Sequence, residues 1–483
     1  MPQPAAAKSA GAVILAYFKD FGVLKETRKE YWGIQLVNFL DSTFYFALLT
    51  ISTIFLSEDL GLDDKWAGYS TAAFTSATSL MLLLSGMYTD WLGIRKSLHL
   101  SMVVMLVLRL GVVVVGLTPS LPYRGILASV LLFLMAPFMA AIQTVFQSSC
   151  QRFTTKRSRS AGFNLWYLFM NVGAAAAGFS IDIVRKILHL PNVHIFTMGV
   201  ILAALCLVVA MTLVRREDQL VSPDEPPETK QEETKVEHKR PLQTLLEVVR
   251  EPTLWRLLVL IVLILGVRAV YAYLYLLMPK YWLRTIGPDA AIGTLNAINP
   301  IGIVVGLILF IPITNKFNVF KMLVYGAMVS AFSLFPLALP WQIYGGNIAT
   351  SHYLMALFCM MIVTIGEVVW SPKLYEYTAA IAPKGQEGTY LGLSLIPWFL
   401  AKTLVSAFSG HMLEHWSPEK VVVNGASVPL QQAMIHNQVP YWHGPAAMWL
   451  ILGGYALAGC IIAVLLRGWL TRGAKWKAQS ARQ

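Results

Sequence analysis

Twelve apolar stretches of about 20 residues run through this chain, and each is long enough to cross the hydrocarbon core of a membrane. Because a backbone in lipid must satisfy its hydrogen bonds internally, each stretch predicts one transmembrane helix. Only 13% of the residues are charged, which is about half the share found in soluble proteins. The predicted spans are 31–57, 66–89, 97–117, 123–149, 160–182, 193–214, 254–278, 291–314, 319–340, 351–372, 388–412 and 443–466.

The distribution of basic residues predicts the orientation of these spans. If the N-terminus is cytoplasmic, 28 of the 38 Lys and Arg residues fall in cytoplasmic tails and loops, and seven fall in outer loops. Positively charged loops stay in the cytoplasm, so we expect both termini there. The apolar stretch near residue 15 is short and lacks a small-residue cleavage site, which favours an interfacial helix over a signal peptide. Compact loops without a signal peptide fit an integral protein of a bacterial inner membrane.

A charged, proline-containing segment divides the spans into six and six. The expected organisation is a cytoplasmic amphipathic segment (1–30), a first six-helix bundle (31–214), a cytoplasmic linker with a juxtamembrane helix (215–253), a second six-helix bundle (254–466) and a cytoplasmic tail (467–483).

A glycine-rich charged loop lies between the second and third spans. Its sequence, GMYTDWLGIRK, supplies Gly86, Asp90, Gly93, Arg95 and Lys96 in eleven residues. So much charge is costly inside a bilayer, which predicts a very short turn at a membrane surface. The pattern resembles the G-x-x-x-D-x-x-G-x-[RK]-[RK] loop of the major facilitator superfamily. The resemblance implies an all-α transporter of twelve helices in two bundles, with Asp90 as a charged latch; an ordinary basic turn is the alternative.

An internal repeat agrees with two related halves. A shift of 225 residues lays the segment 90–96 over 315–321, a degraded copy in which Lys321 keeps its basic position and Asn315 replaces the aspartate. Related halves packed around a central cavity are the expected geometry of such transporters.

Polar residues at helical spacing within the spans are the candidates for function, because an unpartnered polar group facing lipid is costly. The predicted substrate-binding residues are Asn38, Tyr45, Gln143, Gln147, Asn164, Tyr167, Asn171, Arg268, Tyr271, Tyr275, Asn296, Asn299, Trp370, Trp398 and Lys402. A buried carboxylate near a cation can change its protonation with its partner, which predicts proton coupling by Glu367, Asp41 and Arg268. A fixed ion pair between helices is the alternative, and for Arg109 on the third span we expect such a structural pairing.

A narrower resemblance rests on two segments. Residues 366–372 (GEVVWSP), followed by a helix that ends at Ala382 and Pro383, resemble the tenth span of the proton-dependent oligopeptide transporter family. Phe163, Tyr167, Asn171 and Gly173 are similar to the fifth-span pattern F-x-x-x-Y-x-x-x-N-x-G. The resemblance implies that Glu367 takes part in the ion pairing that couples substrate to protons, and that Tyr167 and Asn171 line the cavity.

Departures from that family leave the substrate open. Its first span carries E-x-x-E-R-F-x-Y-Y, whereas here Asp41 is the one carboxylate and no arginine is present; the fourth span also lacks its basic residue. Arg268 and Lys402 could supply a cation from the other half, for a modified peptide, an amino-acid-derived metabolite or another organic anion.

We expect proton-coupled symport of a small peptide-like or amino-acid-derived solute by a monomer that uses alternating access. Proton-coupled efflux of drugs or metabolites and a non-transporting receptor or scaffold are the alternatives. The chain has no nucleotide-binding loop, catalytic motif or metal-ligand spacing, and its four cysteines lie in or near different apolar runs. We therefore expect no enzyme activity, no cofactor and no metal. Scattered basic residues also argue against nucleic acid as a partner.

Overall fold

The computed structural model describes residues 22–155, 158–214, 252–314, 318–381 and 396–472. These residues are helical almost throughout. The two strands among them, β1 (Lys420–Val423) and β2 (Ala426–Pro429), pair antiparallel with Val421 opposite Val428. The predicted interfacial helix and the linker with its juxtamembrane helix lie largely outside the described residues.

The first half of the chain forms long helices, because its apolar runs contain few charges, and the charges of Asp41 and Arg109 within them neutralise each other. Two of the helices continue into a π-helical turn. The elements are η1 (Val23–Glu26), α2 (Lys29–Ile54) with η2 (Phe55–Asp59), α3 (Asp64–Leu92), α4 (Ile94–Leu117), α5 (Arg124–Arg152), α6 (Arg159–Asp182) with η3 (Ile183–Ile187), and α7 (Val193–Leu213).

The second half repeats this arrangement with more breaks and with a structured loop before its last long helix. Its elements are α10 (Pro252–Leu263), α11 (Leu265–Leu276), α12 (Met278–Thr285), α13 (Ile292–Thr314), α14 (Val319–Phe332), α15 (Phe335–Ala338), η4 (Trp341–Tyr344), α16 (Ile348–Ile381), α18 (Ile396–Trp416), β1, β2, α19 (Leu430–Ile435), η5 (Tyr441–His443), α20 (Pro445–Leu465) and α21 (Arg467–Leu470).

Each predicted span overlaps one of these helices or a pair of them, and residues 388–395 of the predicted eleventh span lie outside the described residues. Eight helices in the described part of the chain are long and apolar enough to cross a membrane, and the pair α10 and α11, bent by 44°, makes a ninth. The predicted seventh span is thus not straight, because the helix breaks at Ile264. The helices α3 and α18 are also present and are 29 and 21 residues long, but they are not among the helices apolar enough to be counted. In α13 the described apolar stretch, Ile292–Gly306, is shorter than a full span.

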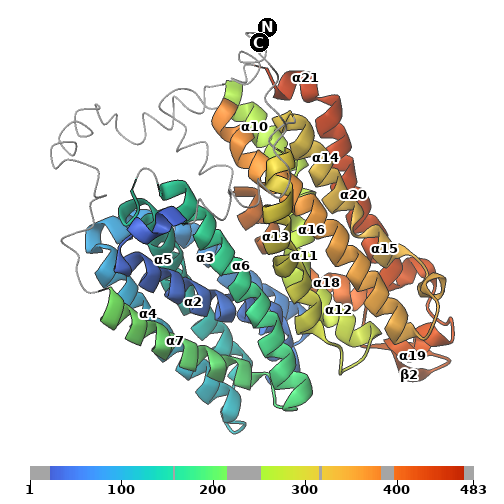
Figure 1. The fold of residues 1–483 in the computed structure, drawn as a ribbon. Coiled ribbons are helices and arrows are strands. Elements are labelled where there is room, and N and C mark those ends of the chain that lie inside the picture. The colour runs from blue at the N-terminus through green and yellow to red at the C-terminus, as the bar shows by residue number, and fades with distance from the viewer. Residues whose placement is uncertain (1–21, 156–157, 215–251, 315–317, 382–395, 473–483) are drawn as a thin grey trace.

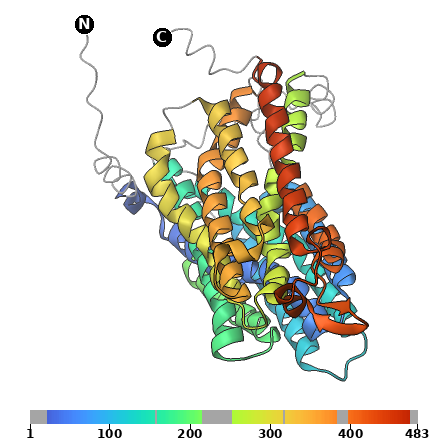
Figure 2. The same cartoon turned by 90° about the vertical axis from the view of Figure 1, so that its right-hand side faces the viewer.

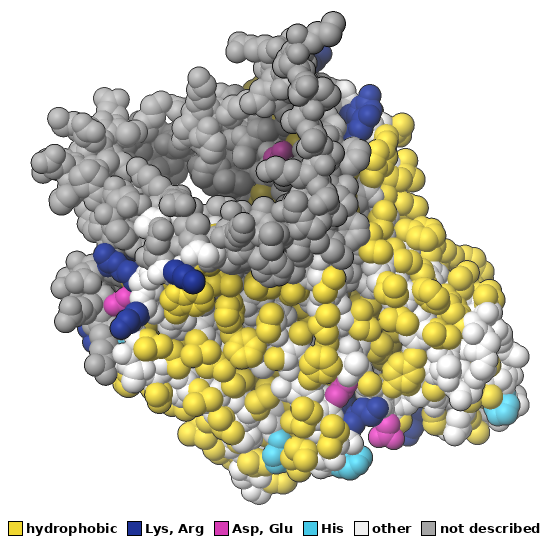
Figure 3. Space-filling view, viewed as in Figure 1, with side chains coloured by type: hydrophobic (Ala, Val, Ile, Leu, Met, Phe, Trp, Pro, Cys, Tyr) yellow, Lys and Arg dark blue, Asp and Glu magenta, His cyan; other side chains and the backbone are white. Residues whose placement is uncertain are grey.

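The flanks of the molecule are apolar. Figure 3 shows hydrophobic side chains over the sides of both groups of helices, and charged side chains near the ends. Val107 on α4 and Val208 on α7 are examples of large aliphatic residues that lie exposed on these flanks. A soluble protein rarely exposes such a continuous apolar surface, so this surface is the one that faces lipid.

Two groups of helices, α2 to α7 and α10 to α20, stand side by side (Figures 1 and 2). We call the end at which α3 begins the Asp64 end, and the end at which α4 begins the Gly93 end. The helix α3 packs on α18 and α6 packs on α13, and these pairs join the halves. Tyr69 contacts His411 toward the Asp64 end, and Ser76 contacts Thr403 nearer the middle of the two helices.

The halves approach each other closely between Gly178 on α6 and Gly293 on α13. A Cβ atom on Gly178 would lie 2.3 Å from the carbonyl oxygen of Gly293, so a side chain does not fit without a shift. One turn further along α6, the Asp182 carboxylate accepts hydrogen bonds from the backbone N–H groups of Gly293 and Thr294, at 2.9 and 2.7 Å. These N–H groups are unsatisfied at a helix start, so Asp182 caps a helix of the other half.

At the Gly93 end, a single residue separates α3 from α4. Gly93 has a φ of 81°, a conformation that favours glycine, and its N–H donates to the Thr89 carbonyl at 2.9 Å. Arg95 and Lys96 are exposed beside it. The predicted tight turn is therefore present, while the side chain of Asp90 and the surroundings of Gly86 lie outside the described part.

Candidate functional site

Two cations of the second half lie close to one tryptophan ring. The guanidinium of Arg268 on α11 stands 4.4 Å above the Trp370 ring and 5.8 Å from the Trp398 ring. The Lys402 ammonium, one turn along α18 from Trp398, lies 4.5 Å from the same Trp398 ring. An aromatic face attracts a cation electrostatically, so these rings partly offset the loss of water around both charges.

Neither cation has a carboxylate partner among the described residues. The side chains of Arg268 and Lys402 are only 6% and 8% exposed, and no carboxylate oxygen lies within 4.0 Å of either. Lys402 donates one hydrogen bond, to the Tyr45 hydroxyl on α2 of the first half, at 2.9 Å. Arg268 has no hydrogen-bond acceptor in the described part of the chain, and its Nε is fully buried.

The nearby carboxylate, Glu367 on α16, bonds to an amide instead of to Arg268. The Nδ2 of Asn299 donates to the Glu367 Oε2 at 3.1 Å and also to the Thr364 hydroxyl at 3.1 Å. Glu367 stands one helical turn before Trp370, on whose ring Arg268 rests. The expected contact of Glu367 with Arg268 is therefore absent in this conformation, although both groups lie beside the same tryptophan.

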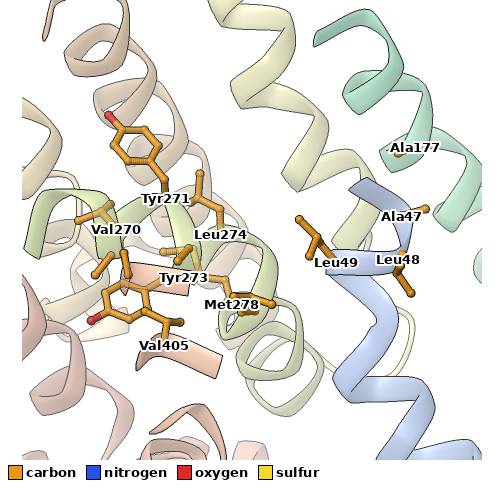
Figure 4. Packing of buried hydrophobic residues seen from close by; sticks show 14 of the residues in the cluster. Ala47, Leu48, Leu49, Ala177, Val270, Tyr271, Tyr273, Leu274, Met278 and Val405 are labelled. Carbon is orange, nitrogen blue, oxygen red and sulfur yellow. The ribbon is translucent and has the colours of Figure 1, made fainter. Parts of the chain in front are cut away.

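A buried hydrogen-bond network fixes the ring beneath Arg268. Trp370 is fully buried, and its Nε1 donates to the Tyr271 hydroxyl at 2.9 Å. The same hydroxyl is 2.6 Å from the Ser330 hydroxyl on α14. Apolar residues surround these groups: Figure 4 shows Tyr271 on the same helical segment as Val270 and Leu274, and Leu49 of α2 across from them.

The first half adds uncharged groups to this region. The ring of Phe46, next to Tyr45 on α2, lies 5.4 Å from the Tyr275 ring on α11. Closer to the Asp64 end, the Asn296 amide donates to the Thr50 hydroxyl across the halves at 3.3 Å. Several side chains at this level are only partly buried: Tyr45, Tyr275, Glu367 and Trp398.

We call the residues Tyr45, Arg268, Asn299, Glu367, Trp370, Trp398 and Lys402 the midplane cluster. All of them are among the residues that the sequence predicts to bind substrate or protons. Tyr271, Tyr275 and Asn296 lie next to the cluster.

Asp41 lies elsewhere, inside the first half. Its carboxylate pairs with Arg109 of α4 at 2.6 Å, and both side chains are completely buried. Arg109 also donates to the Gly199 carbonyl at 3.1 Å, and its guanidinium stands 4.0 Å above the Phe44 ring. The structural pairing expected for Arg109 thus has Asp41 as its partner, and this geometry favours an ion pair that joins α2 to α4.

Among the described residues, no hydrogen bond, ion pair or ring contact joins the remaining predicted residues of the first half to the midplane cluster, although Tyr167 lies within electrostatic range of Glu367 and Arg268. Asn38 is fully buried and donates to the Trp166 carbonyl at 3.0 Å, and Asn171 donates to the Tyr167 carbonyl at 2.9 Å within α6. Gln143 and Tyr167 are half-buried, while Gln147 and Asn164 are exposed.

A second charged group, which sequence reasoning missed, joins the halves at the Asp64 end. The Asp64 carboxylate at the start of α3 bonds to Lys280 and Arg284 of α12, and Arg284 also donates to the Ser417 carbonyl at 2.7 Å. The ion pair of Lys65 with Glu414, 2.7 Å long and largely exposed, lies beside it. In the sequence these charges lie at the borders of predicted spans, where charged loop residues are common. Only their pairing across the halves indicates that they hold the halves together.

Comparison with known proteins agrees with this architecture. The family model described as Major Facilitator Superfamily matches residues 32–406. No curated protein sequence matches the chain.

Several solved structures have a similar fold. A peptide transporter POT in complex with sulfate is similar at a TM-score of 0.68 and 15% identity, over 93% of this chain and 96% of that chain. A POT family transporter in complex with 5-aminolevulinic acid gives 0.67 and 14%, over 92% and 96%. A D-xylose-proton symporter gives 0.63 and 15%, over 90% and 95%.

Proposed function

Because the chain belongs to the major facilitator superfamily, we propose that it is a proton-coupled symporter of a small peptide-like or amino-acid-derived solute. The observation that carries the proposal is the position of Glu367. Its carboxylate bonds to a neutral amide, one turn from a tryptophan that holds the unpaired Arg268. Such a carboxylate has two alternative partners, and its proton occupancy depends on which one it meets.

Solved structures of similar fold support the solute class. One of them holds 5-aminolevulinic acid, an amino-acid-like molecule, and another is named as a proton symporter. The segments around Glu367 and Tyr167 resemble the oligopeptide transporter family, which adds to this support.

The pattern of contacts between the halves supports alternating access. The halves are joined by Asp64, Asp182 and their partners near one end, and the described side chains make no such polar contacts near Gly93. The positive-inside rule makes the Gly93 end cytoplasmic, so we interpret this conformation as inward-facing. In the opposite conformation, contacts near Asp64 would open and the Gly93 end would close. We propose a monomer in a bacterial inner membrane with cytoplasmic termini.

Solute flux in proteoliposomes under a pH gradient of either sign tests the proposal. We expect accumulation of amino-acid-derived solutes when the outside is acidic, and loss of this accumulation in the Glu367→Gln variant, which keeps its shape but cannot ionise. Counterflow exchange by the variant serves as the control for folding. Undiminished accumulation by the Gln variant would refute the assignment, and accumulation only when the lumen is acidic would favour an antiporter.

A further inference from the structure

The midplane cluster holds more positive than negative charge. It contains two cations, Arg268 and Lys402, and a single carboxylate, Glu367, which an amide already engages. The contacts of α2 with the cluster come from Tyr45 and Phe46, which are uncharged. Asp41 cannot balance the excess, because its charge is neutralised by Arg109 inside the first half.

Burial makes this imbalance informative. A cation inside a membrane protein is costly and normally pairs with a carboxylate or with backbone carbonyls. Arg268 is only 6% exposed, yet its guanidinium has no hydrogen-bond acceptor in the described part of the chain. Lys402 has a hydroxyl as its one hydrogen-bond partner among these residues. Two such cations beside one ring indicate that a negatively charged partner arrives from outside the protein.

We infer that the transported solute is an organic anion, and that its carboxylate binds between Arg268 and Lys402 beside Trp398. This inference rests on the proposed function, since it takes the midplane cluster as the solute site. The planar guanidinium of Arg268 can donate two parallel hydrogen bonds to a carboxylate, and the Lys402 ammonium can donate a third. The cations lie 5.8 and 4.5 Å from the Trp398 ring, so we place the carboxylate beside this ring, which both cations approach.

The same geometry orients the rest of the solute. With its anionic end held by the second half, the body of the solute lies toward the aromatic rings of Tyr45, Phe46 and Tyr275. No carboxylate in the cluster is left for a solute ammonium group, because Asn299 holds Glu367. A free amino group is therefore not required, and an acylated amine should bind well.

Proton coupling follows from competition for Arg268. When Glu367 is protonated it remains neutral beside Asn299, and Arg268 is available to the solute. When Glu367 ionises, it becomes an internal anion one turn from the ring that carries Arg268. The solute anion then competes with Glu367, so its affinity falls as the pH rises.

Binding without a gradient tests the charge preference directly. The probes are the N-acetyl derivatives of glycine, leucine and phenylalanine, each as the free acid and as the neutral amide, with phenylalaninamide as a cation. Calorimetric titration of the full chain in lipid nanodiscs at acidic pH should show the acids binding roughly tenfold or more tighter than the amides. Equal affinities, a preference for the cation, or no binding by any acid would each overturn the inference.

Variants identify the residues responsible. Arg268→Gln and Lys402→Gln should each lower the preference for acids over amides by roughly 10- to 100-fold, while Arg268→Lys keeps part of the preference. Lys420→Gln, an exposed lysine in β1, is the control for a lost positive charge. If the variants do not fold, the pH dependence of binding still tests the inference. The affinity for the acids should fall with rising pH in the intact protein and stay constant in Glu367→Gln. A pH-independent acid affinity in the intact protein would contradict the competition.

The outcome also separates this inference from the proposed function. Gradient-driven accumulation of amides as readily as acids would refute the anion site and leave symport standing. Tight, acid-selective binding without accumulation under any gradient would refute symport and keep the anion site.

Discussion

The Lys402 ammonium and the Tyr45 hydroxyl form a hydrogen bond of 2.9 Å that joins α18 of the second half to α2 of the first. Lys402 is therefore shared between two tasks, holding the halves together and attracting the solute. A solute anion that draws Lys402 toward itself competes with Tyr45. Solute binding and the relative position of the halves are therefore coupled through this one ammonium group. Alternating access requires such a coupling between binding and conformation.

Tyr45→Phe tests that coupling. The change keeps the ring and removes one hydrogen bond to a charged donor, worth about 1.5–3 kcal/mol. We expect the conformation with the halves joined at the Asp64 end to lose roughly 10- to 100-fold in population relative to the opposite one. Distances between spin labels on Trp66 and Asp289, one in each half, report this shift. Tyr325→Phe, an identical change on the lipid-facing side of α14, is the control and should leave the distances unaltered.

Asp41→Asn should destabilise the folded protein, and not only uncouple solute transport from protons. The variant leaves Arg109 completely buried beside a neutral amide, and breaking a buried ion pair costs about 3–5 kcal/mol. We expect a clearly lower unfolding midpoint in detergent. Glu414→Gln breaks an ion pair that is largely exposed and should leave the midpoint nearly unchanged. A fully stable Asp41→Asn protein that no longer couples protons would instead support the proton-coupling role expected from the sequence.

The sequence predicts the location of the spans well, because the requirement for about 20 apolar residues is set by the membrane itself. It also predicts the residues of the midplane cluster, since a charge such as Arg268 within a span is too costly to face lipid. It does not distinguish the cluster from the interior of one half. Asp41 and Tyr45 are one turn apart on α2, yet one lies inside the first half and the other contacts the second. That difference depends on how α2 packs, which helical spacing alone does not encode.

Gly178→Ala should force the halves apart at the Asp64 end. The added Cβ would lie 2.3 Å from the Gly293 carbonyl oxygen, well inside contact distance, so α6 and α13 must separate. The spin-label distance at that end should lengthen, and solute affinity measured without a gradient should change with it. Gly454→Ala is the matched control, because no atom lies within 4 Å of its added Cβ. An unchanged distance in Gly178→Ala would show that this contact does not hold the halves together.

Asp64→Asn should act in the same direction through charge. The carboxylate is the shared partner of Lys280 and Arg284, and its loss leaves these two cations of α12 without the charge that holds them to the first half. Coupling of about 1–3 kcal/mol would shift the two conformations roughly 5- to 150-fold toward the one that is open near Asp64. Glu419→Gln, an exposed carboxylate in the loop after α18, is the control. High salt should reproduce only part of the shift, because these charges are partly buried.

Asp90→Asn should shift the conformations in the opposite direction. The superfamily loop motif assigns Asp90 a latch at the Gly93 end, and the corresponding Asn315 of the second half carries no charge, so that the latch would be one-sided. Its loss would favour the conformation open near Gly93, again by roughly 5- to 150-fold. Cysteines placed near that end should then be labelled faster, with solute affinity close to that of the unmodified protein.

The variant that carries both Asp64→Asn and Asp90→Asn distinguishes a latch from a simple turn. Asp64 and Asp90 belong to opposite ends of α3, far apart along the helix, so we expect their effects to add and return the population toward that of the unmodified protein. Labelling near Gly93 that is unchanged by Asp90→Asn, together with a lower unfolding midpoint, would instead identify Asp90 as a structural part of the turn at Gly93.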